Sequence, residues 1–490
     1  MHSLISFVLG SLLSLSFAPF NLWWLAFISL TGIFVLWLTS LHPGRIGFLF
    51  GLGNFTTGVY WVYISLNTYG DAPLAFAILA NITLILYLSL YPMLVGWLLG
   101  KLSVRKSLYR AALIPLLWLI AEFIRSYVLT GFPWLSIGYS QMSSFLHNLA
   151  PIFGSYGVGL VLACLCTLFA YSIVKRTPYP IIIAIFIIAI SAFTKNLHFT
   201  KPMGEAFSVA LVQGNASQYT KFDPNQMYKD LDDYIALSAN RKESVIIWPE
   251  TAIAFMENAV KDNFLIPLDK LYYDKKQTLV TGIATGNLDK DYYNSVITLG
   301  NGSRRYSKEH LLPFGEFTPM KPVFNLFNKY VDIPMSDFSR GGENQKPILT
   351  NGIPAGASIC YEAAFGRVVR QSLPNAQYLI NVSNDGWFQD SIAADQHLQM
   401  NQMRALELGR EMARATNNGY TVFIDHHGHI ISSLPRFEQG VLAGKIQPRI
   451  GLTPYAKYGN NLFLFLLALY AIIVGLMYPM QNRDGKYLSS

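Results

Sequence analysis

The chain has 490 residues, of which 52% are hydrophobic and only 13% are charged. In soluble domains about a quarter of all residues are usually charged, so this composition excludes an ordinary soluble protein. The formal net charge is +8. Its basic residues stand in short loops between apolar runs rather than in a stripe with interleaved aromatics, which argues against nucleic acid as a partner.

Eight apolar runs predict membrane-spanning helices, because a bilayer needs about 20 apolar residues per helix. The runs are 3–20, 22–40, 46–65, 73–100, 109–128, 155–174, 179–195 and 459–478. The first run lacks the basic start of a secretion signal and leads directly into the second, so we expect it to be retained. The sequence therefore predicts a seven-span region at 1–200 and a C-terminal transmembrane helix at 455–480.

Basic residues in the short loops predict the orientation of these spans. One side of the membrane carries Arg45, Lys101, Arg105, Lys106, Arg110, Lys175, Arg176, Arg483 and Lys486. The loops 66–72 and 129–154 on the other side contain no Lys or Arg. Both termini are therefore expected in the cytoplasm, and segment 196–458 is expected outside it.

Two charged residues, Glu122 and Arg125, fall near the outer end of the fifth predicted span. Charges inside a membrane are costly, so they are usually paired or functional. Their i, i+3 spacing allows them to pair with each other. Contact with a lipid headgroup is the alternative, and the sequence leaves both open.

From about residue 204 the pattern changes to short β-type runs that alternate with helical ones, which predicts a layered α/β domain at 204–447. The predicted strands are Phe207–Gln213, Ser244–Trp248, Thr278–Ile283, Asn294–Leu299, Ala357–Cys360 and Tyr378–Val382. Residues 393–416 have apolar positions at helical spacing and predict the clearest helix.

Three segments of this domain end in reactive groups: Glu250 after Trp248-Pro249, Lys308 eight residues before Glu316, and Cys360. Taken singly, a solvated Glu, a surface Lys and a buried thiol are the ordinary interpretations. The other two cysteines lie in an apolar run, so Cys360 is the only thiol of the water-soluble part. Together, a carboxylate base, a cation and a thiol are sufficient for acyl transfer.

In this order and context, Glu250, Lys308 and Cys360 resemble the Glu-Lys-Cys triad of the nitrilase (carbon–nitrogen hydrolase) superfamily, whose fold is an α-β-β-α sandwich. The whole chain resembles the apolipoprotein N-acyltransferase family of the bacterial inner membrane, whose members add the third acyl chain to lipoproteins. The stretches that carry the resemblance are Ser16–Phe20, Thr130–Trp134, Gly138–Gln141, Pro313–Glu316, Ser383–Phe388 and Arg414–Gly419.

The resemblance implies a role for each matching residue. Cys360 is the expected nucleophile, Glu250 the general base, and Lys308 the oxyanion stabiliser, helped by the backbone N–H of Tyr361. Glu316 is expected to orient Lys308 or relay its proton, and Glu362 to shape the pocket beside the thiol. The residues expected at the substrate, partly on a mobile loop, are Phe314, Asn384, Asp385 and Trp387.

The implied reaction moves an acyl chain from a membrane phospholipid to Cys360 and then to the N-terminal amine of a diacylated apolipoprotein, with ping-pong kinetics. A monomer with a periplasmic catalytic domain is expected. The resemblance implies no cofactor and no metal, and the histidines of Asp425–His429 are interpreted as a hairpin turn. The alternatives are a membrane-anchored amidase that hydrolyses a small amide, and a transporter with an accessory domain.

Overall fold

The computed structural model describes residues 1–70, 72–221, 223–318 and 337–486. The chain divides into two compact units. One is helical and comprises Met1–Tyr63, Ile78–Leu197 and the chain from Tyr458. The other combines Ile64–Ala77 with His198–Lys457. The loop 66–72 and the adjoining ends of two predicted spans therefore belong to the α/β unit.

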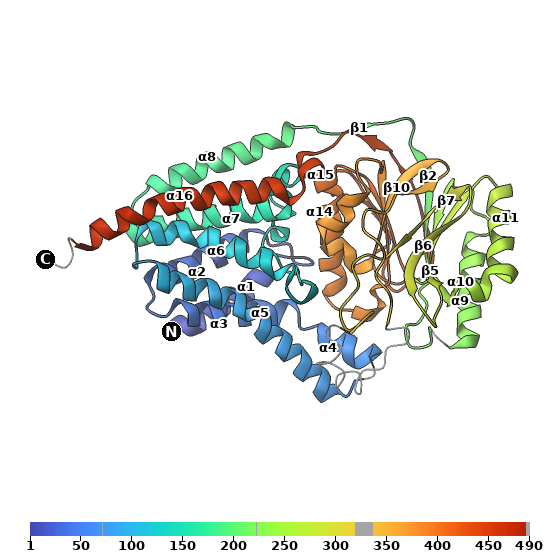
Figure 1. Cartoon of the computed structure of the whole chain (residues 1–490), viewed down its shortest axis with the longest axis horizontal. Coiled ribbons are helices and arrows are strands. Elements are labelled where there is room, and N and C mark those ends of the chain that lie inside the picture. The colour runs from blue at the N-terminus through green and yellow to red at the C-terminus, as the bar shows by residue number, and fades with distance from the viewer. Residues whose placement is uncertain (71, 222, 319–336, 487–490) are drawn as a thin grey trace. The chain divides into compact units, whose positions relative to one another are not determined.

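Each of the eight runs predicted to span the membrane overlaps a helix (Figure 1). The helices are α1 (His2–Ser14), α2 (Trp24–Thr39), α3 (Pro43–Gly58), α5 (Leu74–Leu102), α6 (Leu108–Arg125), α7 (Ala150–Lys175), α8 (Tyr179–Phe193) and α16 (Asn460–Lys486). Among the described residues, four helical stretches are long and apolar enough to cross a membrane: Leu74–Leu102, Phe145–Lys175, Tyr179–Asn196 and Asn460–Tyr478. Helices α1 and α2 are apolar but shorter.

Both charges of α6 bind the loop that follows this helix. The Glu122 carboxylate accepts hydrogen bonds from Trp118 Nε1 at 3.1 Å and from the Ile137 N–H at 3.0 Å. The Arg125 guanidinium donates to the Phe132 and Trp134 carbonyls at 3.1 and 2.6 Å. Both side chains are buried. The contacts favour the structural interpretation of these charges, which fasten the loop to α6.

The α/β unit contains two large sheets. The first has the order β15-β2-β3-β5-β6-β8, with β4 beside β5, and the second has the order β14-β13-β12-β11-β10-β9-β7. The strands of the first are β2 (Phe207–Gln213), β3 (Val245–Ile247), β4 (Ile253–Met256), β5 (Thr278–Gly286), β6 (Tyr292–Gly300), β8 (Arg305–Ser307) and β15 (Gly440–Ile446). Those of the second are β7 (Gly302–Ser303), β9 (Ile348–Thr350), β10 (Ile353–Ile359), β11 (Tyr378–Ser383), β12 (Met412–Thr416), β13 (Val422–Ile424) and β14 (Ile430–Ser433).

Shorter elements complete this unit. They are a π-helix at Ser65–Tyr69, the strand pair β1 (Lys201–Pro202) and β16 (Arg449–Ile450), α9 (Pro224–Ser238), α10 (Glu257–Val260), α11 (Ile266–Asp274), α13 (Gly366–Val369), α14 (Ala393–Leu408) and α15 (Pro454–Tyr458). The short helix α4 (Val62–Ile64) lies at the boundary between the two units. Each of the six predicted strands is confirmed, and β2 has the predicted bounds.

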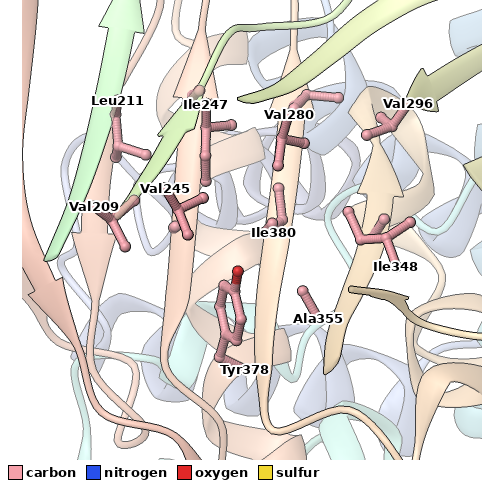
Figure 2. Close-up of a cluster of buried hydrophobic side chains, with 14 of the residues drawn as sticks. Val209, Leu211, Val245, Ile247, Val280, Val296, Ile348, Ala355, Tyr378 and Ile380 are labelled. Carbon is pink, nitrogen blue, oxygen red and sulfur yellow. The ribbon is translucent and has the colours of Figure 1, made fainter. Parts of the chain in front are cut away.

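Three apolar layers hold the sheets and helices together. Between the sheets, side chains such as Val209 and Ile247 of the first meet Ile380 and Tyr378 of the second (Figure 2). Helices α9 and α11 cover the outer face of the first sheet, and α14 covers the outer face of the second (Figure 1). Strands buried on both faces read as continuous apolar runs, as β11 does. The result is the expected α-β-β-α sandwich.

The centre of each sheet is parallel. Strands β10, β11 and β12 run in one direction, and so do β2, β3 and β5. Parallel strands bring their carboxyl ends to one edge of a sheet, which is where open α/β folds build their sites. Polar segments that follow β10, β11 and β12 therefore lie beside one another.

The predicted helix at 393–416 is wrong in its last third. Helix α14 ends at Leu408, because Gly409 adopts a φ of +60° and caps it. Residues Met412–Thr416 then form β12. All five residues of this strand are buried. Its sequence therefore lacks the apolar–polar alternation by which a half-exposed strand is recognised.

Candidate active site

The three residues of the expected triad each follow a strand. Glu250 stands three residues after β3, Lys308 directly follows β8, and Cys360 directly follows β10. Their exposed fractions are 7%, 1% and 8%. Ionisable groups are rarely so buried unless they are paired, and the contacts below provide the pairing.

Lys308 lies between two carboxylates. Its Nζ is 2.8 Å from Glu316 Oε2 and 3.4 Å from Glu250 Oε1. Burial alone would lower the pKa of the ammonium, but Glu316 and Glu250 outweigh this effect and raise the pKa above its usual value. Lys308 is therefore a permanent cation at neutral pH.

Asn294 of β6 joins the same two carboxylates from another side. Its Nδ2 donates to Glu250 Oε1 and to Glu316 Oε1, both at 2.8 Å. The second oxygen of Glu250 accepts the Asn384 N–H at 3.0 Å. The Glu250 carboxylate is thus held in position by a lysine, an amide and a backbone donor.

Cys360 opens the five-residue 3-10 helix Cys360–Ala364, and its φ of +49° lies in the left-handed region. This conformation is uncommon for non-glycine residues, because their Cβ atom crowds the following carbonyl oxygen. Burial raises the pKa of the thiol to about 12, and the Glu250 charge adds to the rise, whereas Lys308 opposes it. The resting thiol is therefore protonated, so it needs a base when it reacts.

Glu362 is fully buried and binds the chain segments of both Lys308 and Cys360. Its Oε1 accepts from Tyr306 Oη at 2.8 Å, from the Glu309 N–H at 2.7 Å and from the His310 N–H at 3.0 Å. Its Oε2 accepts the Ile359 N–H at 2.8 Å. Through these bonds Glu362 connects the segment of Lys308 to that of Cys360. Glu362 therefore stabilises the position of both segments.

Glu316 is presented by a tight turn. Phe314 has a φ of +61°, its N–H donates to the Phe317 carbonyl at 2.8 Å, and the Leu312 N–H donates to Glu316 Oε2 at 2.8 Å. The Phe314 side chain is half-buried. Tyr361, next to the thiol, is buried, and its ring centroid lies 5.1 Å from that of Phe365.

The loop after β11 carries the remaining expected residues. Asn384 Nδ2 donates to Gln218 Oε1 at 2.6 Å, and Asp385 lies fully buried below. The Trp387 side chain is half-buried, and its carbonyl accepts a hydrogen bond from Ser65 Oγ at 2.7 Å. Ser65 begins the π-helix of segment Ile64–Ala77. Thus this segment contacts the loop beside the thiol.

Several polar residues of this region were assigned no role from the sequence. Besides Asn294, these are Lys221, His397 and Arg414, all almost completely buried. Burial lowers the pKa of Lys221 to about 8, although Glu250, Asp230 and Cys360 act against it. Arg414 stands in one of the stretches that carry the family resemblance. The others stand in no motif, and no local pattern reveals that they are buried.

The expected hairpin at Asp425–His429 is confirmed, because β13 and β14 pair antiparallel on either side of it. The Asp425 Oδ1 atom accepts the His427 and His429 N–H groups at 2.9 and 2.8 Å. Within the part of the chain that the structure describes, no group of three His, Cys, Asp or Glu residues could hold a metal ion.

Both parts of the chain match known protein families. Residues 9–168 match the family model "Apolipoprotein N-acyltransferase N-terminal domain", and residues 208–455 match "Carbon-nitrogen hydrolase". The chain is 38% identical to an apolipoprotein N-acyltransferase of Methylococcus capsulatus over 97% of this chain and 95% of the other. A protein of the same name from Photobacterium profundum is 37% identical over 98% and 95%.

Among solved structures, an amidase of the nitrilase superfamily from Nesterenkonia is similar, with 16% identity and a TM-score of 0.39, over 52% of this chain and 95% of that one. The NitFhit protein of C. elegans has 15% identity and a TM-score of 0.38, over 57% of this chain and 64% of that one.

Proposed function

The chain belongs to the apolipoprotein N-acyltransferase family, and we propose that it transfers an acyl chain from a membrane phospholipid to the N-terminal amine of diacylglyceryl-cysteine on apolipoproteins. This reaction is the last step of lipoprotein maturation. The observation that carries the chemistry is the buried group of Glu250, Lys308 and Cys360. The carboxylate and the ammonium lie 3.4 Å apart, and the charges of both influence the pKa of the thiol.

In the first half-reaction, Cys360 Sγ attacks the ester carbonyl of the phospholipid while Glu250 takes the thiol proton. The developing oxyanion is stabilised by Lys308 and by the Tyr361 N–H. The C–O bond then breaks, and Glu250 returns the proton to the leaving oxygen. A thioester on Cys360 and a lysophospholipid are the products. The raised thiol pKa supports this order, because the proton must leave during the attack.

In the second half-reaction, the neutral α-amine of the apolipoprotein attacks the thioester. Glu250 accepts a proton from the attacking nitrogen, and Lys308 again stabilises the oxyanion. The C–S bond breaks, the sulfur regains its proton from Glu250, and an amide is released. Since the first product leaves before the amine binds, the kinetics are ping-pong. Glu316 keeps Lys308 in place through the cycle, and its 2.8 Å contact supports that role.

We place the enzyme in the bacterial inner membrane as a monomer with eight spans, both termini in the cytoplasm and a periplasmic catalytic domain. The division is a seven-span region at 1–200, a catalytic domain at 204–447 and a final span at 455–480. Loop 66–72 and segment 196–458 are predicted on the same side. The bond between Ser65 and Trp387 supports this arrangement.

Attachment of the catalytic domain to a membrane unit suits this chemistry. Both substrates carry acyl chains embedded in lipid, and exposing such a chain to water costs about 0.8 kcal/mol per CH₂. A helical membrane unit in the same chain removes the need for that extraction. An amidase acting on small soluble amides has no such need, and the relatives aligned over nearly the full chain are named acyltransferases.

The test uses the full-length enzyme in phospholipid micelles. Incubation with phospholipid alone should add one acyl group to Cys360, seen by mass spectrometry, and a diacylated lipopeptide should then remove it as an amide. Cys360→Ser and Glu250→Gln should give no thioester. An adduct of the same mass on Cys360→Ala would refute the nucleophile. Ammonia release from soluble amides would instead support the amidase.

A further inference from the structure

His397 of α14 contacts the backbone of the nucleophile. Its side chain is 1% exposed, and its Nε2 atom lies 2.9 Å from the carbonyl oxygen of Cys360. A carbonyl oxygen can only accept a hydrogen bond, so Nε2 must carry the proton and donate it. The histidine therefore binds the backbone of Cys360, where the chain adopts its left-handed conformation.

The bonded carbonyl belongs to the peptide that joins Cys360 to Tyr361. Because a trans peptide is planar, the Tyr361 N–H points away from the carbonyl on the opposite side of the same unit. This N–H is the donor assigned to the oxyanion in the proposed reaction. A donor on the carbonyl end fixes the orientation of the peptide plane, and it polarises the peptide so that its N–H becomes a stronger donor.

A buried ion network holds the imidazole in place. His397 Nδ1 lies 3.1 Å from Asp385 Oδ1 and 3.2 Å from Arg414 Nη2, and the same Arg414 nitrogen donates to Asp385 Oδ2 at 2.8 Å. Asp385 also accepts from Ser383 Oγ at 2.9 Å. Asp385 and Arg414 are at most 1% exposed. Burial would raise the Asp385 pKa, but Arg414 and His397 hold it below its usual range.

Burying three such groups is costly, and replacing a buried ion network with apolar side chains is often neutral or stabilising. Stability alone is therefore a weak reason for this network. One of its members, His397, binds the carbonyl of the nucleophile, and the other two contact the opposite nitrogen of its ring. Arg414 and Asp385 bind each other and together hold the Nδ1 side of the His397 ring, and its Nε2 side orients the Cys360–Tyr361 peptide.

We propose that His397 is a positioning residue that aligns and polarises the Cys360–Tyr361 peptide for oxyanion binding, with Asp385 and Arg414 fixing its ring. This inference rests on the proposed function, in which Cys360 is the nucleophile. It assigns Asp385 to the support of the nucleophile rather than to direct substrate contact.

Two reactions of the same thiol test the inference. Acylation by phospholipid passes through an oxyanion, whereas alkylation by iodoacetamide is a displacement at a saturated carbon and forms none. Both are followed on the Cys360 peptide of the full-length enzyme by mass spectrometry, so that Cys164 and Cys166 do not interfere. His397→Ala should slow acylation about tenfold to a hundredfold, because misalignment of an oxyanion donor should cost no more than its complete loss. The same substitution should leave the alkylation rate unchanged.

His397→Gln retains an N–H donor and should recover part of the acylation rate. Met403→Ala is the matched control, because it also removes a buried side chain of α14 but lies outside the network. It should leave the ratio of the two rates at the wild-type value. Equal slowing of acylation and alkylation in His397→Ala, or no slowing of either, would overturn the inference. Failure of the wild type to form any thioester would instead overturn the proposed function.

Discussion

The Lys308 ammonium lies 3.4 Å from Glu250 Oε1, and both side chains are nearly inaccessible to water. The pair is formed by two segments that follow strands of the same sheet. In a buried environment the attraction between these charges is large, and so is the cost of leaving either one alone. This relationship links the stability of the site to its chemistry, because the base and the oxyanion stabiliser hold each other in position.

Removing the Lys308 charge should therefore affect both activity and stability. In Lys308→Met, the Glu250 and Glu316 carboxylates lose their shared cation, so we expect unfolding to become easier by about 3–5 kcal/mol. Loss of the oxyanion stabiliser should slow thioester formation by about 10²–10³-fold. Thermal unfolding and single-turnover acylation measure the two effects. Lys270→Met, at an exposed lysine of α11, is the control and should change neither.

The Glu250 charge should have opposite effects on two reactions of Cys360. Burial and the nearby carboxylate together raise the thiol pKa to about 12. Glu250→Gln should therefore lower that pKa, and alkylation by iodoacetamide at alkaline pH should become faster. The same substitution removes the general base and should slow acylation by about 10²–10⁴-fold. Rates measured from pH 7 upward on both reactions provide the test. A parallel change of the two rates would contradict the assignment of Glu250 as the base.

The sequence was informative wherever a local pattern decides the structure. The strands before Glu250 and Cys360 were predicted, because β-type runs that end in polar residues are visible within a few positions. Parallel pairing then explains why such ends meet. The grouping of Glu250, Lys308 and Cys360 depended on the family resemblance, since no single motif specified it.

Other features depend on contacts between distant segments. Asn294 was placed at the start of a predicted strand, but its bridge between Glu250 and Glu316 follows from how β6 packs beside β5. His397 reads as a polar position of a helix, and only the fold brings it to the Cys360 carbonyl. Segment Ile64–Ala77 comprises a predicted loop and the adjoining ends of two predicted spans, yet it belongs to the α/β unit. Such long-range pairings leave no trace in local periodicity.

Glu362 should make the stability of the α/β unit depend on pH. Burial raises its pKa from 4.5 to about 7, although hydrogen bonds from His310 and Ile359 oppose this effect. A carboxyl whose folded pKa is raised binds its proton more tightly in the folded state. Its stabilising contribution is therefore complete below pH 4.5 and is lost as the pH rises through 7.

The measurement for Glu362 is thermal unfolding between pH 4.5 and 8. The wild type should lose stability over this range, by roughly 3 kcal/mol for this group alone. Glu362→Gln cannot titrate, so its stability should vary less with pH over the same range. It should also be less stable at low pH, since its amide cannot reproduce all of the accepted bonds. Equal pH dependence in the two proteins would show that Glu362 is not the responsible group.

Ser65 should order the loop that lies beside the thiol. Its hydroxyl donates to the Trp387 carbonyl at 2.7 Å, and a single bond of this kind contributes about 0.5–1.5 kcal/mol. Ser65→Ala should therefore speed amide hydrogen exchange of residues 384–389 by about twofold to tenfold. The loop also carries Asn384, whose N–H binds Glu250, so acylation should slow as well. Asn67→Ala is the control, because it removes a bond to Ala72 within the same segment and should leave exchange of the loop unchanged. If Ser65→Ala alters neither exchange nor acylation, the segment covers the loop without ordering it.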